Sequence, residues 1–249
     1  MSDSPPLSLH SQSGNFPPTR HSVVQAAQSE DPAARSRAIE AITAAYWKPV
    51  YKYVRMKWTT SSENAADFTQ EFFTRLLEKE FLDSYDSSKG RLRTFLRTCA
   101  DRLFLNQARD SERLKRGGGC VHFPLDFAEA ELELALVPGS ESPEDYFDQE
   151  WVRSLFVLGL ERLRANCESR GKLLQFQLFE RCDLSDADPK PSYARLAREF
   201  GVAVSDVTNY LAFARREFRR SVLDQLREMT SSEQEFRREA QALLGVEIR

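Results

Sequence analysis

The sequence has little of what metal sites and disulfide frameworks are built from. Its 249 residues include three histidines and four cysteines. The histidines stand alone, with no cysteine or acid at metal-ligand spacing: His10, His21 and His122. The cysteines are far apart and form no C-x-x-C pair: Cys99, Cys120, Cys167 and Cys182. We therefore expect no metal, no other cofactor, and reduced, mostly buried thiols.

Long apolar runs are also missing. No apolar stretch reaches the length of about 18 residues that a membrane span requires. The N-terminus, MSDSPPLSLHSQSGNFPPTR, lacks a basic start followed by an apolar stretch, so no secretion signal is indicated. Residues 1–20 are rich in Ser and Pro, which predicts a disordered tail. Together these features predict a cytoplasmic protein with no membrane contact.

Signatures of catalysis are absent as well. The glycine run in KRGGGC is not a phosphate loop, because no Gly-Lys-Ser/Thr follows it and no strand precedes it. No nucleophile with a neighbouring base can be argued from the sequence. We therefore expect a protein that is not an enzyme.

Strand-type alternation is missing throughout, and helical periodicity takes its place. Apolar residues recur every three or four positions at Ile39, Ile42, Tyr46 and Val50. Pro49 is expected to kink or interrupt this helix. Further helices are expected in AADFTQEFFTRLLEKEF, which has a broad apolar stripe, and from Arg91 to about residue 115. The sequence therefore predicts an all-α fold.

The distribution of charge divides the chain. Residues 117–150 contain nine acids and no Lys or Arg, which indicates an acidic linker with a short helix around FAEAELELAL. A long amphipathic helix is then expected from Asp148 to about Cys182. The predicted division is a tail at 1–20, a first helical domain at 21–116, the linker at 117–147, a second helical domain at 148–225 and a C-terminal helical extension at 226–249.

The stretch PSYARLAREFGVAVSDVTNYLAFARREFRR, residues 191–220, predicts a helix-turn-helix. Ser192 and Ser205 are placed to cap its two helices, and Gly201 suits the left-handed turn between them. A buried stripe at steps of three and four leaves a polar, basic face outside. A surface helix with merely solvated arginines has the same pattern, so this stretch alone leaves DNA binding open.

The net charge of −3 averages over blocks of opposite sign. Nine Lys or Arg stand against three acids from Ser88 to Arg116, whereas seven acids stand against two bases from Trp58 to Ser87. This pattern predicts one face for a polyanion and another for a basic or polar partner.

Two motifs in this order resemble a known family. AADFTQEFFTRLL, followed by SSKGRLRTFLRTCADRLFLNQARDSERLKR, resembles the second conserved region of bacterial RNA polymerase sigma factors of the extracytoplasmic-function type. The stretch at 191–220 resembles the fourth region of that family, and FPPTRHSVVQAA resembles the start of one of its branches. The resemblance covers roughly residues 16–225. It implies a factor that binds core RNA polymerase and directs promoter recognition, DNA melting and initiation.

The resemblance assigns a role to each block. The clamp helices of the polymerase would be bound by Asp67, Gln70, Glu71 and Phe72. The minus-ten element would be met by Phe81, Tyr85, Arg91, Arg93, Arg97, Arg102, Asn106 and Arg109. The minus-thirty-five element would be met by Ser205, Thr208, Asn209, Ala212, Arg215, Arg216 and Arg219. The second domain would also dock on the polymerase flap, and the linker would run toward the RNA exit path. For the arginines, a solvated surface role remains an alternative.

One departure from the family pattern stands just before the T-Q-E run. The family usually has several acids there, whereas this sequence has Asn64, Ala65 and Ala66 before Asp67. Immediately upstream are Thr59, Thr60, Ser61 and Ser62. A phosphate on one of them would add a charge of about −1.5 to −2. Polymerase binding that waits for a Ser/Thr kinase is therefore a hypothesis, and a plain helix-capping loop is the alternative.

Two other functions fit parts of the sequence. A stand-alone helix-turn-helix regulator would use 191–220 but leave the 58–116 block without a role. A helical adaptor would need no nucleic acid at all. An inhibitory partner such as an anti-sigma factor is a further partner that the sequence leaves open.

Overall fold

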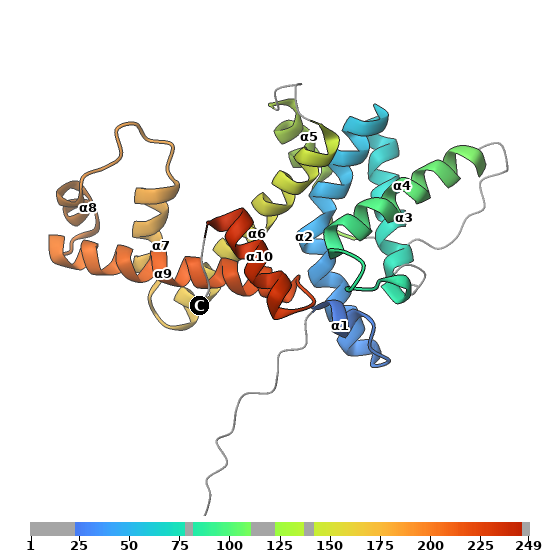
Figure 1. Cartoon of the computed structure of the whole chain (residues 1–249). Helices are drawn as coiled ribbons and strands as arrows, with labels where there is room; N and C mark the ends of the chain where they lie inside the picture. The colour runs from blue at the N-terminus through green and yellow to red at the C-terminus, as the bar shows by residue number, and fades with distance from the viewer. Residues whose placement is uncertain (1–22, 78–81, 111–122, 137–141, 246–249) are drawn as a thin grey trace, which may run out of the picture.

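The protein is described by a computed structural model that covers residues 23–77, 82–110, 123–136 and 142–245 (Figure 1). Within these ranges every regular element is a helix and no strand occurs, which confirms the all-α prediction. The predicted tail at 1–20, and parts of the predicted linker, lie outside the described residues.

The helices follow one another in this order: α1 (Val23–Ala27), α2 (Pro32–Trp58), α3 (Ser62–Leu77), the 3-10 turn η1 (Leu82–Ser84), α4 (Leu92–Asp110), α5 (Phe127–Ala135), α6 (Pro143–Ser169), α7 (Leu173–Phe179), the π-turn η2 (Glu180–Leu184), α8 (Tyr193–Phe200), α9 (Val204–Glu228) and α10 (Glu233–Leu244).

Helix α2 is the centre of the first core. Asp31 caps it by accepting the N–H of Ala33 at 3.0 Å, and proline occupies its first turn. The helix runs unbroken through Pro49, so the expected interruption is wrong. Tyr46 and Val50 are fully buried on either side of the proline, and this packing outweighs the one backbone hydrogen bond that proline removes.

Two hydrophobic cores share their helices. The first surrounds α2 and takes in α3, α4, α5, the N-terminal half of α6, and the end of the chain through Phe236 and Ala240. The second joins the C-terminal half of α6 to α7, α8 and the first half of α9. Helices α6 and α9 therefore run through both cores. The two helices cross (Figure 1), and Gly159 of α6 lies against Val222 of α9. The predicted boundaries at 147/148 and 225/226 do not separate these cores.

The helix expected from Asp148 to about Cys182 is divided in two. Helix α6 ends at Ser169, and Gly171 follows with a φ of +63°, a backbone conformation that glycine adopts without strain. The sequence pattern missed this turn because apolar residues continue on both sides of it. The predicted short helix in the acidic segment is present as α5.

The acidic segment does not stand free of the first core. Glu129 and Glu133 of α5 accept hydrogen bonds from Lys48 at 3.0 and 2.8 Å, and Arg55 donates to Glu131 at 2.6 and 2.9 Å. Further along, Lys52 bridges Glu133 and Glu150. These pairs attach the linker to a basic stripe on α2.

Candidate nucleic-acid and polymerase interface

One side of α4 is a polar surface. Its exposed polar residues recur every three or four positions, which is the spacing of one helix face: Arg91, Thr94, Thr98, Arg102 and Asn106. The opposite positions, Leu92, Leu96 and Leu103, are in the first core.

A hollow of about 330 Å³ lies beside this polar face. Its lining comes from the loop before α4, with Tyr85, Lys89 and Gly90, and from α4 itself. The Tyr85 hydroxyl donates to the Gly90 carbonyl at 3.0 Å, and its ring lies 5.1 Å from that of Phe95. Burial, followed by the carboxylate of Glu235, raises the pKa of Tyr85 to about 12. The tyrosine therefore stays neutral and forms a fixed aromatic wall.

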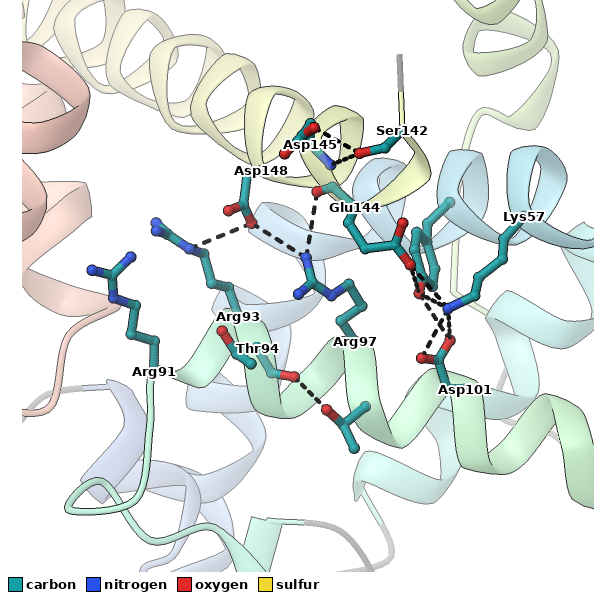
Figure 2. Close-up of polar contacts among 12 residues, drawn as sticks. Lys57, Arg91, Arg93, Thr94, Arg97, Asp101, Ser142, Glu144, Asp145 and Asp148 are labelled. Atoms are coloured by element: carbon teal, nitrogen blue, oxygen red, sulfur yellow. Dashed lines mark hydrogen bonds and ion pairs between the residues drawn. The ribbon is translucent and has the colours of Figure 1, made fainter. Parts of the chain in front are cut away.

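Arg93 and Arg97 share a face, as their spacing predicts, but it is the face that packs on α6 (Figure 2). Arg93 is only 6% exposed; its Nε is 3.4 Å from Asp148, and its guanidinium lies 5.0 Å from the Trp151 ring. Arg97 donates to the Glu144 carbonyl at 3.4 Å and lies over an aromatic ring. In this structure neither arginine reaches the polar surface of α4, which corrects that part of the predicted DNA site.

The other predicted minus-ten residues divide as follows. Arg102 and Asn106 are exposed on the polar face of α4. Phe81 lies outside the described residues, as does the side chain of Arg109. Thr94, Thr98 and Lys89 were not among the residues predicted for the minus-ten element. The three- and four-residue steps from Arg91 would have placed both threonines on the same helix face as Arg91.

Helix α3 carries the predicted polymerase site. Asp67 is exposed, and Glu71 is half-buried, where it accepts from Arg75 at 2.6 Å and from Gln107 at 2.5 Å. Gln70 is buried and holds the backbone of Phe123 through two hydrogen bonds, at 2.7 and 2.8 Å. Phe72 is fully buried in the first core. Only the two carboxylates are therefore at the surface, and the placement of Gln70 and Phe72 at an interface is corrected to structural roles.

The Thr59–Ser62 segment joins α2 to α3 and is largely exposed. Thr59 ends α2 with a φ of +47°, and Ser61 accepts the N–H of Asn64 at 3.2 Å. Ser61 thus makes the capping contact expected of a plain helix-start loop. The same position places any added phosphate at the N-terminus of α3, where a helix favours negative charge.

The stretch at 191–220 forms two helices joined by a tight turn. Ser192 accepts the N–H of Arg195 at 3.3 Å and so caps α8, and Gly201 has a φ of +66°. Helix α9 begins two residues earlier than predicted, with Ala203 and not Ser205 at the cap position. The Asp206 carboxylate accepts the Ala203 N–H at 3.3 Å, so Ser205 lies inside the first turn and does not cap it.

All seven residues predicted for the minus-thirty-five element are exposed on α9, and Val207, Leu211 and Ala214 form the buried stripe. Arg215 differs from its neighbours, because its guanidinium donates to both oxygens of Asp183 at 2.8 and 2.9 Å. The Asp183 carboxylate, and after it the Tyr193 hydroxyl, raise the pKa of Arg215. The ion pair of Arg215 holds the loop before α8 against α9, whereas Arg216 and Arg219 extend from the helix.

Other kinds of site find no support in the part of the chain that the structure describes. No group of His, Cys, Asp and Glu there could hold a metal ion. Cys99, Cys167 and Cys182 are free and buried, and burial raises the pKa of the Cys99 thiol to about 11. None of the helices in the described ranges is both long and apolar enough to cross a membrane.

A comparison with protein families gives one match. Residues 43–114 match the family model for Sigma-70 region 2. The match spans most of α2, all of α3 and α4, and the loop that forms the hollow beside α4. The comparisons found no similar curated protein and no similar solved structure.

Proposed function

The chain belongs to the RNA polymerase sigma-70 family through its region 2, and we propose that it is a sigma factor of the extracytoplasmic-function type that directs initiation at specific promoters. Region 2 supports a role in polymerase binding and promoter melting, and members of this family are initiation factors and not enzymes. The single observation that carries the finer proposal is the hollow beside α4, which lies within the matched residues.

The hollow fits an unstacked base of the minus-ten element. A base taken out of a duplex needs an aromatic or apolar wall and polar groups for its edge. Tyr85 and Phe95 supply the wall, and Thr94 and Thr98 supply hydroxyls. Arg102 and Lys89 lie at the same hollow with cations for the backbone. The phosphates on either side of the base would meet these two cations.

The exposed carboxylates of α3 are the proposed contact with the polymerase clamp. Asp67 and Glu71 present negative charge from one helix face, which suits a basic partner. The α8–α9 pair would read the minus-thirty-five element. The N-terminal part of the second helix of such a pair meets base edges, which favours Thr208 and Asn209 as readers, with Arg216 and Arg219 on phosphates.

Co-purification with bacterial core RNA polymerase tests the proposal. We expect a stoichiometric complex that Asp67→Ala weakens and that Glu30→Ala, an exposed acid outside the match, leaves intact. Absence of a complex, together with retention of promoter duplex by the protein alone, would overturn the proposal. That result would favour a stand-alone DNA-binding regulator.

We further propose that a Ser/Thr kinase strengthens polymerase binding by modifying the exposed Thr59–Ser62 segment. The support is its position at the start of α3, next to the stretch that lacks the family's usual acids. Polymerase affinity should rise for Ser62→Asp. It should stay unchanged for Ser62→Asn, because asparagine has the shape of aspartate without its charge. Equal affinities would leave the segment with its capping role alone.

A further inference from the structure

The C-terminal helix α10 contacts the arginines at the start of α4. Glu239 is 2% exposed, and its Oε2 accepts from Arg93 Nη1 at 2.5 Å. Its other oxygen lies 2.8 Å from Arg91 Nε. One carboxylate of α10 thus pairs with two guanidinium groups at the start of α4.

This contact reaches the hollow proposed for the minus-ten base. Arg91 lines that hollow and is paired with Glu239 at the same time. The negative charge of Glu235, which is also on α10, contributes to the raised pKa of Tyr85, the aromatic wall of the hollow. Helix α10 therefore touches the proposed DNA site at its cationic rim and places negative charge near its wall.

The charge on this side of α4 is largely cancelled. Asp148 lies 3.4 Å from Arg93 and 4.0 Å from Arg97, so two acids, Asp148 and Glu239, face three arginines. Phosphate binding by arginine depends on available positive charge. While α10 is docked, the guanidinium of Arg91 is paired with the buried carboxylate of Glu239. A DNA phosphate at Arg91 would therefore meet a charge that is already neutralised in part.

The docking of α10 depends on these ion pairs. The helix has twelve residues, a length at which isolated helices are marginal in water. Its apolar contact with the first core is narrow, made by Phe236 and Ala240 with partly buried Leu243. Docking also buries Glu235 and Glu239, which is unfavourable unless the charges are paired. A competing anion at Arg91 and Arg93 would therefore loosen the helix.

We propose that α10 is a built-in competitor of promoter DNA, with Glu239 holding the site that a backbone phosphate of the minus-ten element takes when the helix undocks. This inference rests on the proposed function of the α4 face. DNA and docked α10 exclude each other at Arg91, so the C-terminal helix lowers DNA affinity in the free protein.

The test measures binding of a fluorescein-labelled, mixed-sequence single-stranded DNA by anisotropy at several salt concentrations. Glu239→Gln keeps the shape of the side chain and removes its charge. We expect binding about three- to tenfold tighter, because affinity scales with the fraction of molecules in the open state. The dependence of log K on log salt should steepen by roughly 0.7 for each phosphate gained on a single strand.

Glu161→Gln is the matched control, since it makes the same change at an exposed position outside α10 and should leave affinity unchanged. Equal affinities of Glu239→Gln and the unaltered chain would overturn the competition. If Arg102→Ala still weakens binding in that case, the proposed DNA face survives. If no variant, including Arg102→Ala, changes DNA binding, the proposed function of the α4 face fails as well.

Hydrogen exchange of the unaltered chain gives a second test that needs no substitution. Amides of α10 should lose protection when the single-stranded DNA is added, while those of α7 in the second core keep theirs. Protection of α10 that stays unchanged with DNA bound would overturn the proposal.

Discussion

The two helices proposed to meet DNA, α4 and α9, present their arginines in different ways. On α9 every predicted contact is exposed, and the closest ion pair among these residues, between Arg215 and Asp183, joins α9 to the loop just before α8. On α4 the arginines at 91, 93 and 97 are bound to acids from α6 and α10. The same residue type is thus a surface group on one helix and part of the tertiary structure on the other.

The difference has a physical cause. Arg93 lies between Trp151 and two carboxylates, so a planar cation with many donors joins three helices. On α9 the basic residues follow a short buried stripe and are exposed. The local sequence pattern is enough to place the basic residues of α9 at the surface. The position of Arg93 on α4 depends instead on contacts with distant parts of the chain.

The largest effect that would sharpen this comparison is expected for Arg93→Ala. Removing one partner of a buried ion pair leaves Glu239 without its closest cation and costs about 3 to 5 kcal/mol. Arg216→Ala on α9 should change stability by less than about 0.5 kcal/mol. Urea unfolding of both variants measures the difference. Equal losses would show that the α4 arginine is no more structural than its counterpart.

A second prediction concerns the crossing that connects the two regions. Gly159→Ala would place a methyl group 2.6 Å from Val222 Cγ2 and 3.2 Å from the Val222 nitrogen. We expect a loss of about 1 to 3 kcal/mol from overpacking. In a double-mutant cycle by urea unfolding, Val222→Ala should relieve part of this loss. Strictly additive losses would contradict the close contact of α6 with α9.

A third prediction separates reading from positioning on α9. Asn209→Ala should lower discrimination at one base position of the minus-thirty-five element by about 1 to 3 kcal/mol. Arg216→Ala should weaken all sequences alike and reduce the salt dependence of binding. Competition binding of the holoenzyme to a library of promoter duplexes measures both. Uniform weakening by Asn209→Ala would remove it from the base-reading set.

The smallest effect is expected for Arg215→Ala. Its pair with Asp183 is about half exposed, and such pairs contribute up to about 1 kcal/mol to stability. Thermal unfolding should show a slight decrease in Tm, which Arg219→Ala should not produce. A loss as large as that of Arg93→Ala would erase the contrast between the two helices.

Much of this arrangement follows from local sequence. The cap at Ser192, the turn at Gly201 and the stripe through Leu211 need only neighbours within one or two turns, and the structure has all three. The polar face of α4 likewise follows from three- and four-residue steps. The exposure of Asp67 agrees with its place on the polar side of α3.

What could not be predicted involves partners far apart in the chain. The covering of Arg93 by Glu239 joins residues separated by 146 positions. The family resemblance placed Gln70 at an interface, yet its amide holds the backbone of Phe123, 53 residues away. The second core ends within α6, so no change of composition marks the boundary there. Such pairings are set by tertiary packing, which local periodicity does not encode.

The most direct test of the central claim is run-off transcription by core RNA polymerase reconstituted with this chain on a pool of candidate promoters. We expect transcripts with defined start sites that appear only when the chain is added. Arg102→Ala should reduce these transcripts, and Arg164→Ala, a control at an exposed position of α6, should not. Transcripts that are independent of the chain, or equal for both variants, would contradict the central claim.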